Sequence, residues 1–196
     1  MEQHSTEVHK LMFVCTINRY RSVIGEYLFK NMVEERDKKL AQRIEVSSAG
    51  IVTKEQRLEI KERGISIPKP LFGYRQMPCV ILYMQKTARI DVSEYRSKVI
   101  NGTMAKKADL IITMSENHKD AILISYSVTK GKVLTLSELS RPFQFPNIVE
   151  EPPGLMVPPQ FCMLKCDHWS LTDEIILEIK DRLEEAMSKI LFRLDL

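Results

Sequence analysis

The sequence predicts an α/β fold: a doubly wound, four-stranded parallel sheet with helices on both faces. Three observations support this prediction. Apolar runs of strand length recur along the chain, helical patterns follow them, and the last segment is strongly amphipathic. The chain has 196 residues, of which 44% are hydrophobic and 28% charged, a balance that lets a single domain spanning residues 1–196 bury a core.

The first predicted unit is a strand, a helix and a second strand. Residues 10–16 contain an apolar run that would be buried on both faces, as in a parallel strand covered by helices. Apolar residues then recur at helical spacing over residues 22–38. A second strand over residues 44–48 ends at Gly50 and closes the first βαβ unit.

The same alternation returns in the second half of the chain. Residues 108–114 predict a buried strand, residues 115–124 a helix that Ser115 could cap, and residues 132–136 a fourth strand.

The C-terminal segment predicts a long helix over residues 171–194, which Thr172 or Asp173 could cap. Its apolar residues form one stripe at helical spacing. The stripe consists of Ile175, Ile176, Ile179, Leu183, Ala186, Met187 and Ile190.

Two stretches do not follow the alternating pattern. Residues 51–87 form an insertion after the second strand, with a helical piece at 55–63 and a short β run at 80–84, and we expect a hairpin or lid there. Residues 140–170 contain most of the nine prolines and predict an irregular Pro-rich loop before the C-terminal helix. Long loops of this kind often carry function.

Charge and cysteine content narrow the possible functions. The net charge of +3 is too small to indicate a nucleic-acid partner. No apolar run is long enough to cross a membrane and residues 1–10 lack a secretion signal, so we expect a cytoplasmic protein without a membrane partner. Four cysteines are too few for a disulfide framework, so an important cysteine should be catalytic or redox-active.

The segment that follows the first predicted strand carries the strongest functional signal. Ligands of open α/β sheets bind at the carboxyl ends of the strands, and here a loop joins such an end directly to a helix. Its backbone N–H groups and the positive end of the helix can point at a single anion. The residues of this loop, between Cys15 and Arg21, are Thr16, Ile17, Asn18, Arg19 and Tyr20.

The residue types at the two ends of this loop suit phosphate chemistry. Loop amides, the helix and Arg21 would stabilise a Cys15 thiolate and lower its pKa from the reference value of about 8.5. The Arg21 guanidinium can hold two phosphate oxygens, and the Ser22 hydroxyl can donate to the sulfur. The alternative is a structural Cys15 at a buried strand end, followed by an unrelated arginine.

Other residues around this loop have two interpretations each. Arg19 could attract anions at the pocket mouth or be a solvated charge. Tyr20, Tyr74 and Tyr83 could wall a phenolic substrate or belong to the core. His118 is expected to be an exposed histidine or one whose hydrogen bonds are satisfied internally.

The loop resembles that of the low-molecular-weight protein tyrosine phosphatase family, whose pattern is C-x-x-N-x-x-R-S. Cys15, Asn18, Arg21 and Ser22 match this pattern. Three further segments are similar to the family: Ser48-Ala49-Gly50, the predicted strand 108–114, and residues 90–97, which resemble a stretch reading Ile-Asp-x-Ser-x-His-x-Ala or Ser.

The resemblance implies a flavodoxin-like fold and a two-step reaction without a metal or cofactor. Cys15 would attack phosphorus to form a cysteinyl-phosphate, with Arg21 and the loop amides binding the phosphate oxygens, and water would then release phosphate. Asn18 would shape the loop through a hydrogen bond toward Ser48, or by tolerating a left-handed conformation. The implied substrate is a phosphorylated protein or a small aryl phosphate.

The chain departs from the family pattern in the loop and at the general acid. Ile17 stands where the family commonly has glycine, so it should keep a negative φ. Tyr20 replaces a second cysteine that protects the nucleophile in many relatives. The family usually supplies an Asp-Pro as the acid, and Glu151, which precedes Pro152, occupies the nearest matching place. The other candidates for this role are Glu150 and Asp167.

The remaining cysteines leave two other functions open. Cys162 and Cys166 could belong to a zinc site only with further ligands such as Asp167 and His168, whereas Cys79 stands alone in the insertion. Thioredoxin-coupled arsenate reductases share the implied fold and loop and use two further cysteines. The third possibility is a non-catalytic anion-binding module.

Overall fold

The computed structural model describes residues 7–51, 73, 75–140 and 169–196, with the side chains of the last range described from residue 175 onward. These residues contain a four-stranded sheet in which every pairing is parallel and the strand order is β2-β1-β3-β4. The strands are β1 (His9–Cys15), β2 (Ile44–Gly50), β3 (Leu110–Thr113) and β4 (Val133–Thr135). This arrangement confirms the predicted α/β class and the four predicted strands.

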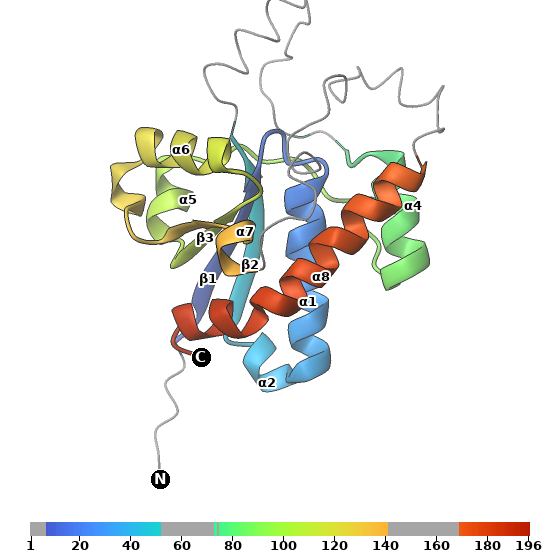
Figure 1. The fold of residues 1–196 in the computed structure, drawn as a ribbon, viewed down its shortest axis with the longest axis horizontal. Coiled ribbons are helices and arrows are strands. Elements are labelled where there is room, and N and C mark those ends of the chain that lie inside the picture. Colours follow the sequence, from blue (N-terminus) through green and yellow to red (C-terminus); the bar gives the residue numbers. More distant parts are fainter. Residues whose placement is uncertain (1–6, 52–72, 74, 141–168) are drawn as a thin grey trace, which may run out of the picture.

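Helices cover both faces of the sheet, as the prediction required (Figure 1). Helices α1 (Arg21–Arg36) and α8 (Trp169–Arg193) lie together on one face, and α5 (Gly102–Lys107) and α6 (Glu116–Ser125) lie on the other. The shorter elements are α2 (Lys38–Ala41), α4 (Pro78–Tyr83), the π-helical turn η1 (Met84–Ala88), the 3-10 turn η2 (Ser127–Thr129) and α7 (Leu136–Leu139). Within the described ranges, no helix has the length and apolarity of a membrane span.

The central strand β1 divides the core into two apolar clusters. Because side chains alternate along a strand, Leu11, Phe13 and Cys15 face the α1 and α8 side, whereas Met12 and Val14 face the α5 and α6 side. All five are at most 4% exposed. The apolar run therefore forms a strand that is buried on both faces, and Cys15 ends it on the α1 side.

The C-terminal helix α8 contributes the apolar stripe that its sequence predicts. All seven residues of the stripe are buried, and they join the same cluster as Phe13 and the inner face of α1. The helix begins at Trp169, two residues before the predicted start.

The predicted β run at 80–84 is wrong, because these residues are helical. Pro78 occupies the first turn of α4, where its missing N–H costs nothing, and the turn η1 continues the helix. Val80, Tyr83 and Met84 then face the core at the i, i+3, i+4 spacing of a helix. A short apolar run does not distinguish the two structures by itself. The predicted helical piece at 55–63 and the loop 141–168 lie outside the described residues.

Candidate active site

The loop between β1 and α1 is polar in sequence and nevertheless buried. Thr16 and Asn18 are 1% and 0% exposed, and Ser22, in the first turn of α1, is also fully buried. Arg21 is 6% exposed. Since β1 ends at Cys15 and α1 begins at Arg21, the positive end of a 16-residue helix points toward this loop.

Asn18 is the centre of the hydrogen bonds that shape the loop. Its Nδ2 donates to Ser48 Oγ at 2.8 Å and to Ser22 Oγ at 2.9 Å. Its Oδ1 accepts from the backbone N of Lys98 at 2.8 Å and from the Tyr95 hydroxyl at 3.0 Å. Asn18 also has a φ of 54°, so both expectations for this residue, the bond to Ser48 and the left-handed conformation, are confirmed.

The neighbouring Ile17 is not among the residues of positive φ, as a β-branched side chain in the place of glycine requires. Asn18 thus takes the left-handed position of the loop, and Ile17 does not disturb the turn.

A directional series of hydrogen bonds leads from a buried carboxylate to the Cys15 sulfur. Ser48 Oγ donates to Glu26 Oε2 at 2.7 Å, and the oxygen of the same hydroxyl accepts from Asn18. Asn18 in turn donates to Ser22 Oγ, which lies 3.0 Å from Cys15 Sγ. Because Ser22 accepts from Asn18, its own hydrogen is available for the sulfur. This geometry suits a hydroxyl that donates to a thiolate.

Glu26 itself is only 3% exposed, and Lys30 Nζ lies 2.5 Å from its Oε1. The pair connects the buried network to the surface of α1. The sequence did not single out Glu26, although a carboxylate on the inward face of a predicted helix was the available signal.

Gly50 allows the loop to approach the end of β2. A Cβ at Gly50 would lie 2.6 Å from the Thr16 carbonyl oxygen and 3.1 Å from the Asn18 nitrogen. The backbones are also bonded here, since the Ile51 N–H donates to the Cys15 carbonyl at 2.8 Å. Only glycine fits at this position without a shift of the loop.

His118 supports the other side of the loop from α6. Its Nε2 lies 2.8 Å from Thr16 Oγ1 and its Nδ1 lies 2.6 Å from Ser115 Oγ. The ring is 1% exposed, so burial first, and the Arg21 charge second, lower the pKa of His118 to about 3. The internally satisfied alternative is therefore confirmed. Ser115 is the N-cap residue of α6 as predicted, but its hydroxyl bonds to His118 rather than to a backbone N–H.

Tyr95 occupies the histidine position of the family-like segment 90–97. Its hydroxyl lies 2.8 Å from Ser48 Oγ and donates to Asn18. Burial, and then the nearby Glu26 charge, raise the pKa of Tyr95, so the hydroxyl stays protonated and able to donate. The match of this segment to the family pattern was the signal that could have identified Tyr95.

The two remaining loop residues, Arg19 and Tyr20, are half-buried. Arg19 donates from Nε to the Arg75 carbonyl at 2.8 Å. Tyr20 is half-buried against the α1-side cluster and Tyr83 is buried in it, so Tyr83 belongs to the core rather than to a substrate wall. Tyr74 lies outside the described residues.

Five of the sequence candidates lie outside the described residues: Glu150, Glu151, Asp167, Cys162 and Cys166. Cys15 and Cys79 are not joined in a disulfide, and Cys79 is half-buried in α4. Among the described ranges, no three His, Cys, Asp or Glu side chains gather closely enough to hold a metal ion.

Comparison with known proteins supports the resemblance that the loop motif indicates. A family model described as low molecular weight phosphotyrosine protein phosphatase matches residues 10–69. A low molecular weight protein-tyrosine-phosphatase, Ptp, from Acinetobacter johnsonii is 29% identical over 126 residues, covering 64% of this chain and 70% of that protein.

Solved structures show the same fold. The low molecular weight protein tyrosine phosphatase from T. tengcongensis has a TM-score of 0.64 at 22% identity, covering 92% of this chain and 99% of that one. A YwlE mutant from Bacillus subtilis has a TM-score of 0.65 at 18% identity, covering 93% and 98%. Another structure, described as the YwlE arginine phosphatase, has a TM-score of 0.64 at 20% identity, covering 93% and 95%. With the C-x-x-N-x-x-R-S loop built as described, these matches show that the chain has the fold of the low-molecular-weight protein tyrosine phosphatases and resembles them in sequence over residues 10–69.

Proposed function

We propose that this protein hydrolyses phosphotyrosine or similar aryl phosphomonoesters through a cysteinyl-phosphate on Cys15. The observation that carries the proposal is the 3.0 Å contact between Cys15 Sγ and Ser22 Oγ, inside a buried loop at the start of α1. The hydrogen bonds of Asn18 hold that loop before any substrate arrives. Such preorganised donors lower a barrier without reorganising during the reaction.

The first step transfers the phosphoryl group to sulfur. The Cys15 thiolate attacks phosphorus, an S–P bond forms, and the P–O bond to the phenol breaks. The Arg21 guanidinium and the N–H groups of residues 16–20 bind the three phosphate oxygens. A carboxylic acid donates its proton to the departing oxygen, and we assign this role to Glu151, with Glu150 and Asp167 as the alternatives.

The second step returns the enzyme to its starting state. Water attacks phosphorus and gives a proton to the same carboxylate, while the S–P bond breaks. The Ser22 hydroxyl donates to the departing thiolate and stabilises it. No step needs a metal ion or an organic cofactor.

A steady-state assay with p-nitrophenyl phosphate tests this proposal. The Cys15→Ser variant should lose at least about 10³-fold in kcat, because its hydroxyl is a poor nucleophile and leaving group, whereas Cys79→Ser should keep wild-type turnover. Vanadate should inhibit the wild type. Binding of vanadate without any turnover would instead support a non-catalytic anion-binding module.

The general acid is tested with leaving groups of different basicity. Glu151→Gln should slow the release of poor leaving groups more than that of p-nitrophenol, because only poor leaving groups need the proton. If Asp167→Asn has this effect and Glu151→Gln does not, the acid is Asp167.

The same enzyme preparation can be assayed for two related activities, arsenate reduction and phosphoarginine hydrolysis. Arsenate reduction would consume reduced thioredoxin and would stop in Cys162→Ser or Cys166→Ser, which phosphate hydrolysis would not. Because one neighbour is described as an arginine phosphatase, phosphoarginine should be assayed beside phosphotyrosine. We expect a higher kcat/KM for phosphotyrosine. The single-domain organisation and the cytoplasmic location stay predictions.

A further inference from the structure

A short two-stranded ribbon lies beside the phosphate-binding loop. Arg75 and Arg96 form an isolated antiparallel bridge, and the Gly73 N–H donates to the Ser97 carbonyl at 2.8 Å. We call residues 75–76 and 95–98 the clamp ribbon. It brings together two segments that are about 20 residues apart in the sequence and that both contact Asn18.

The inner face of the clamp ribbon holds the loop. Gln76, Tyr95 and Ser97 are 2%, 8% and 2% exposed. Gln76 Nε2 donates to the Asn18 carbonyl at 3.4 Å and the Tyr95 hydroxyl donates to the Asn18 side chain. Side chains alternate along extended backbone, so the residues between these inward ones must face outward.

The outer face of the clamp ribbon is basic. The outward positions are Arg75 and Lys98, which are exposed, and Arg96, whose side chain is 36% exposed and whose Nη1 also donates to the Ser93 and Tyr95 carbonyls. Arg19 of the loop, which is half-buried, contacts the ribbon, because its Nε donates to the Arg75 carbonyl. Lys98 Nζ lies 5.1 Å from the centre of the Tyr95 ring, which holds this cation close to the loop.

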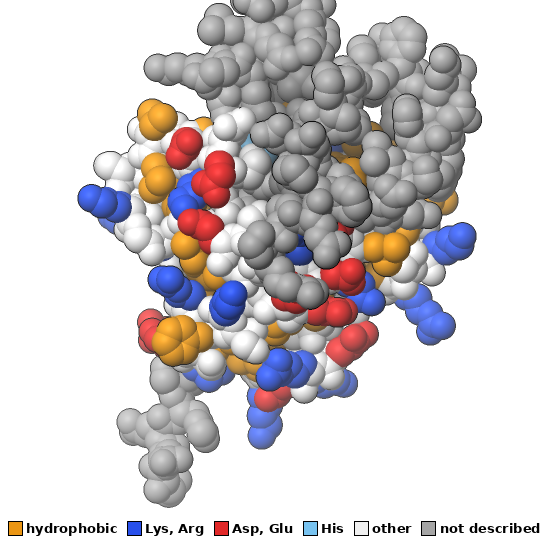
Figure 2. Space-filling model, viewed as in Figure 1, with side chains coloured by type: hydrophobic (Ala, Val, Ile, Leu, Met, Phe, Trp, Pro, Cys, Tyr) orange, Lys and Arg blue, Asp and Glu red, His pale blue; other side chains and the backbone are white. Residues whose placement is uncertain are grey.

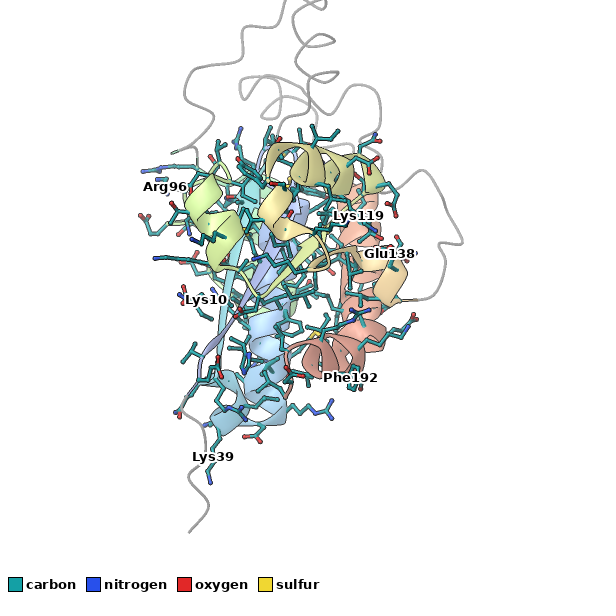
Figure 3. All side chains as sticks on the ribbon, turned by 90° about the vertical axis from the view of Figure 1, so that its left-hand side faces the viewer. Lys10, Lys39, Arg96, Lys119, Glu138 and Phe192 are labelled. Carbon is teal, nitrogen blue, oxygen red and sulfur yellow. The ribbon has the colours of Figure 1, made fainter. Side chains whose placement is uncertain are left out.

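Acidic groups balance little of the charge of Arg75, Arg96 and Lys98. Among the described residues, the carboxylate that pairs with one of these three cations is Glu94, which lies 3.5 Å from Arg96 and is itself 87% exposed. Elsewhere the surface is mixed: basic and acidic side chains are interspersed over the face shown in Figure 2. Figure 3 shows Arg96 toward the same end of the molecule as the carboxyl ends of the strands, and Lys39 at the opposite end.

We propose that the outer face of the clamp ribbon selects phosphotyrosine segments that carry acidic residues beside the phosphotyrosine. The inference rests on the proposed function and names its substrate class. A phosphotyrosine bound in the loop places the neighbouring residues of an extended peptide at about 3.3 Å per residue along the rim, within reach of Arg75, Arg96 and Lys98. Cations on the outer face of the clamp ribbon attract carboxylates and repel basic residues beside the phosphotyrosine.

The test compares two phosphotyrosine peptides, one flanked by glutamates and one by glutamines, in low salt. The double variant Arg75→Gln, Arg96→Gln should raise KM for the acidic peptide about fivefold, since exposed ion pairs contribute modestly each. KM for the glutamine peptide and turnover of p-nitrophenyl phosphate should stay at wild-type values. Lys39→Gln, an exposed cation on α2, is the matched control and should change nothing.

Raising the salt concentration should reduce the wild-type preference for the acidic peptide, because exposed charges are screened. Equal KM values of the wild type for both peptides would overturn the proposal. The proposal would also be overturned if the double variant bound phosphatidylserine vesicles more weakly than the wild type but kept both peptide KM values. That result would indicate a membrane contact.

Failure of the proposed function is distinguishable from failure of this inference. If the wild type does not hydrolyse p-nitrophenyl phosphate, the peptide comparison is made by fluorescence anisotropy, where a preference for the acidic peptide that the double variant loses still supports the basic rim. Equal affinities for the two peptides would then overturn it.

Discussion

Asn18 joins three segments that lie far apart in the sequence, and its contacts explain why the loop keeps its shape. The side chain donates to Ser22 and Ser48 and accepts from Tyr95 and the Lys98 backbone. The bond to Ser48 was predictable from the resemblance of the two motifs. The bonds to residues 95 and 98 were not, because they depend on how a distant loop packs against the end of the sheet.

Gly50 provides a sharp test of this close packing. Gly50→Ala should lower kcat/KM for p-nitrophenyl phosphate about 10²-fold, because a methyl group 2.6 Å from the Thr16 carbonyl must displace the loop. Steady-state kinetics measures the loss. The control is Gly102→Ala, at the start of α5, where a Cβ meets no atom within 4 Å. Wild-type kinetics in Gly50→Ala would contradict the close approach of loop and strand.

His118 links the stability of the site to pH. Its pKa of about 3 in the fold lies below the value of about 6.5 for an unfolded chain, so acid protonates the unfolded chain first. The contribution of this group to stability is complete above pH 6.5 and is lost as the pH falls toward 3. Between pH 6.5 and pH 5 the loss should be about 2 kcal/mol.

Urea unfolding at pH 7 and pH 5 measures this effect. The free energy of unfolding should fall more steeply with acid in the wild type than in His118→Gln, which keeps a polar side chain near Thr16 and Ser115 but does not titrate. The same pH dependence in both proteins would show that His118 is not held neutral by burial.

At the scale of elements, long periodic segments were predicted well and short ones were not. The stripe of α8 and the buried run of β1 each carry enough apolar positions to define a period. The segment 80–84 has too few apolar positions to define a period, and in the structure it belongs to α4 and η1. Pro78 starts this helix, and Val80 and Met84 pack in the core. Helix α5 was missed, although its N-cap Asn101 accepts from the Met104 N–H.

Helix α8 should contribute strongly to the stability of the sheet face that carries Cys15. Leu183→Ala should lower the free energy of unfolding by about 2–5 kcal/mol, because Leu183 is fully buried in the α1-side cluster. Leu177→Ala on the same helix is the control. Leu177 is 47% exposed, and its truncation should cost about 0.5 kcal/mol or less. Similar losses in the two variants would contradict the observed orientation of the helix.

At the scale of the whole molecule, the parallel sheet brings the site together. The register aligns Cys15 of β1 with Gly50 of β2, so the loop, β2 and the 95–98 segment meet at one edge. The fold class and the loop were predictable because both are local patterns in the sequence. The hydrogen bonds of Tyr95 and Glu26 and the His118–Thr16 contact were not predictable, since the partners in these bonds are set by long-range packing.

The central claim is that phosphate passes through a covalent bond to Cys15, and trapping that bond tests it most directly. Wild-type enzyme is quenched in acid during turnover of p-nitrophenyl phosphate, and peptide mass spectrometry locates the bound phosphate. We predict phosphocysteine at Cys15, equally in Cys79→Ser, and no phosphocysteine in Cys15→Ser. Phosphate on another residue, or wild-type turnover by Cys15→Ser, would contradict the account.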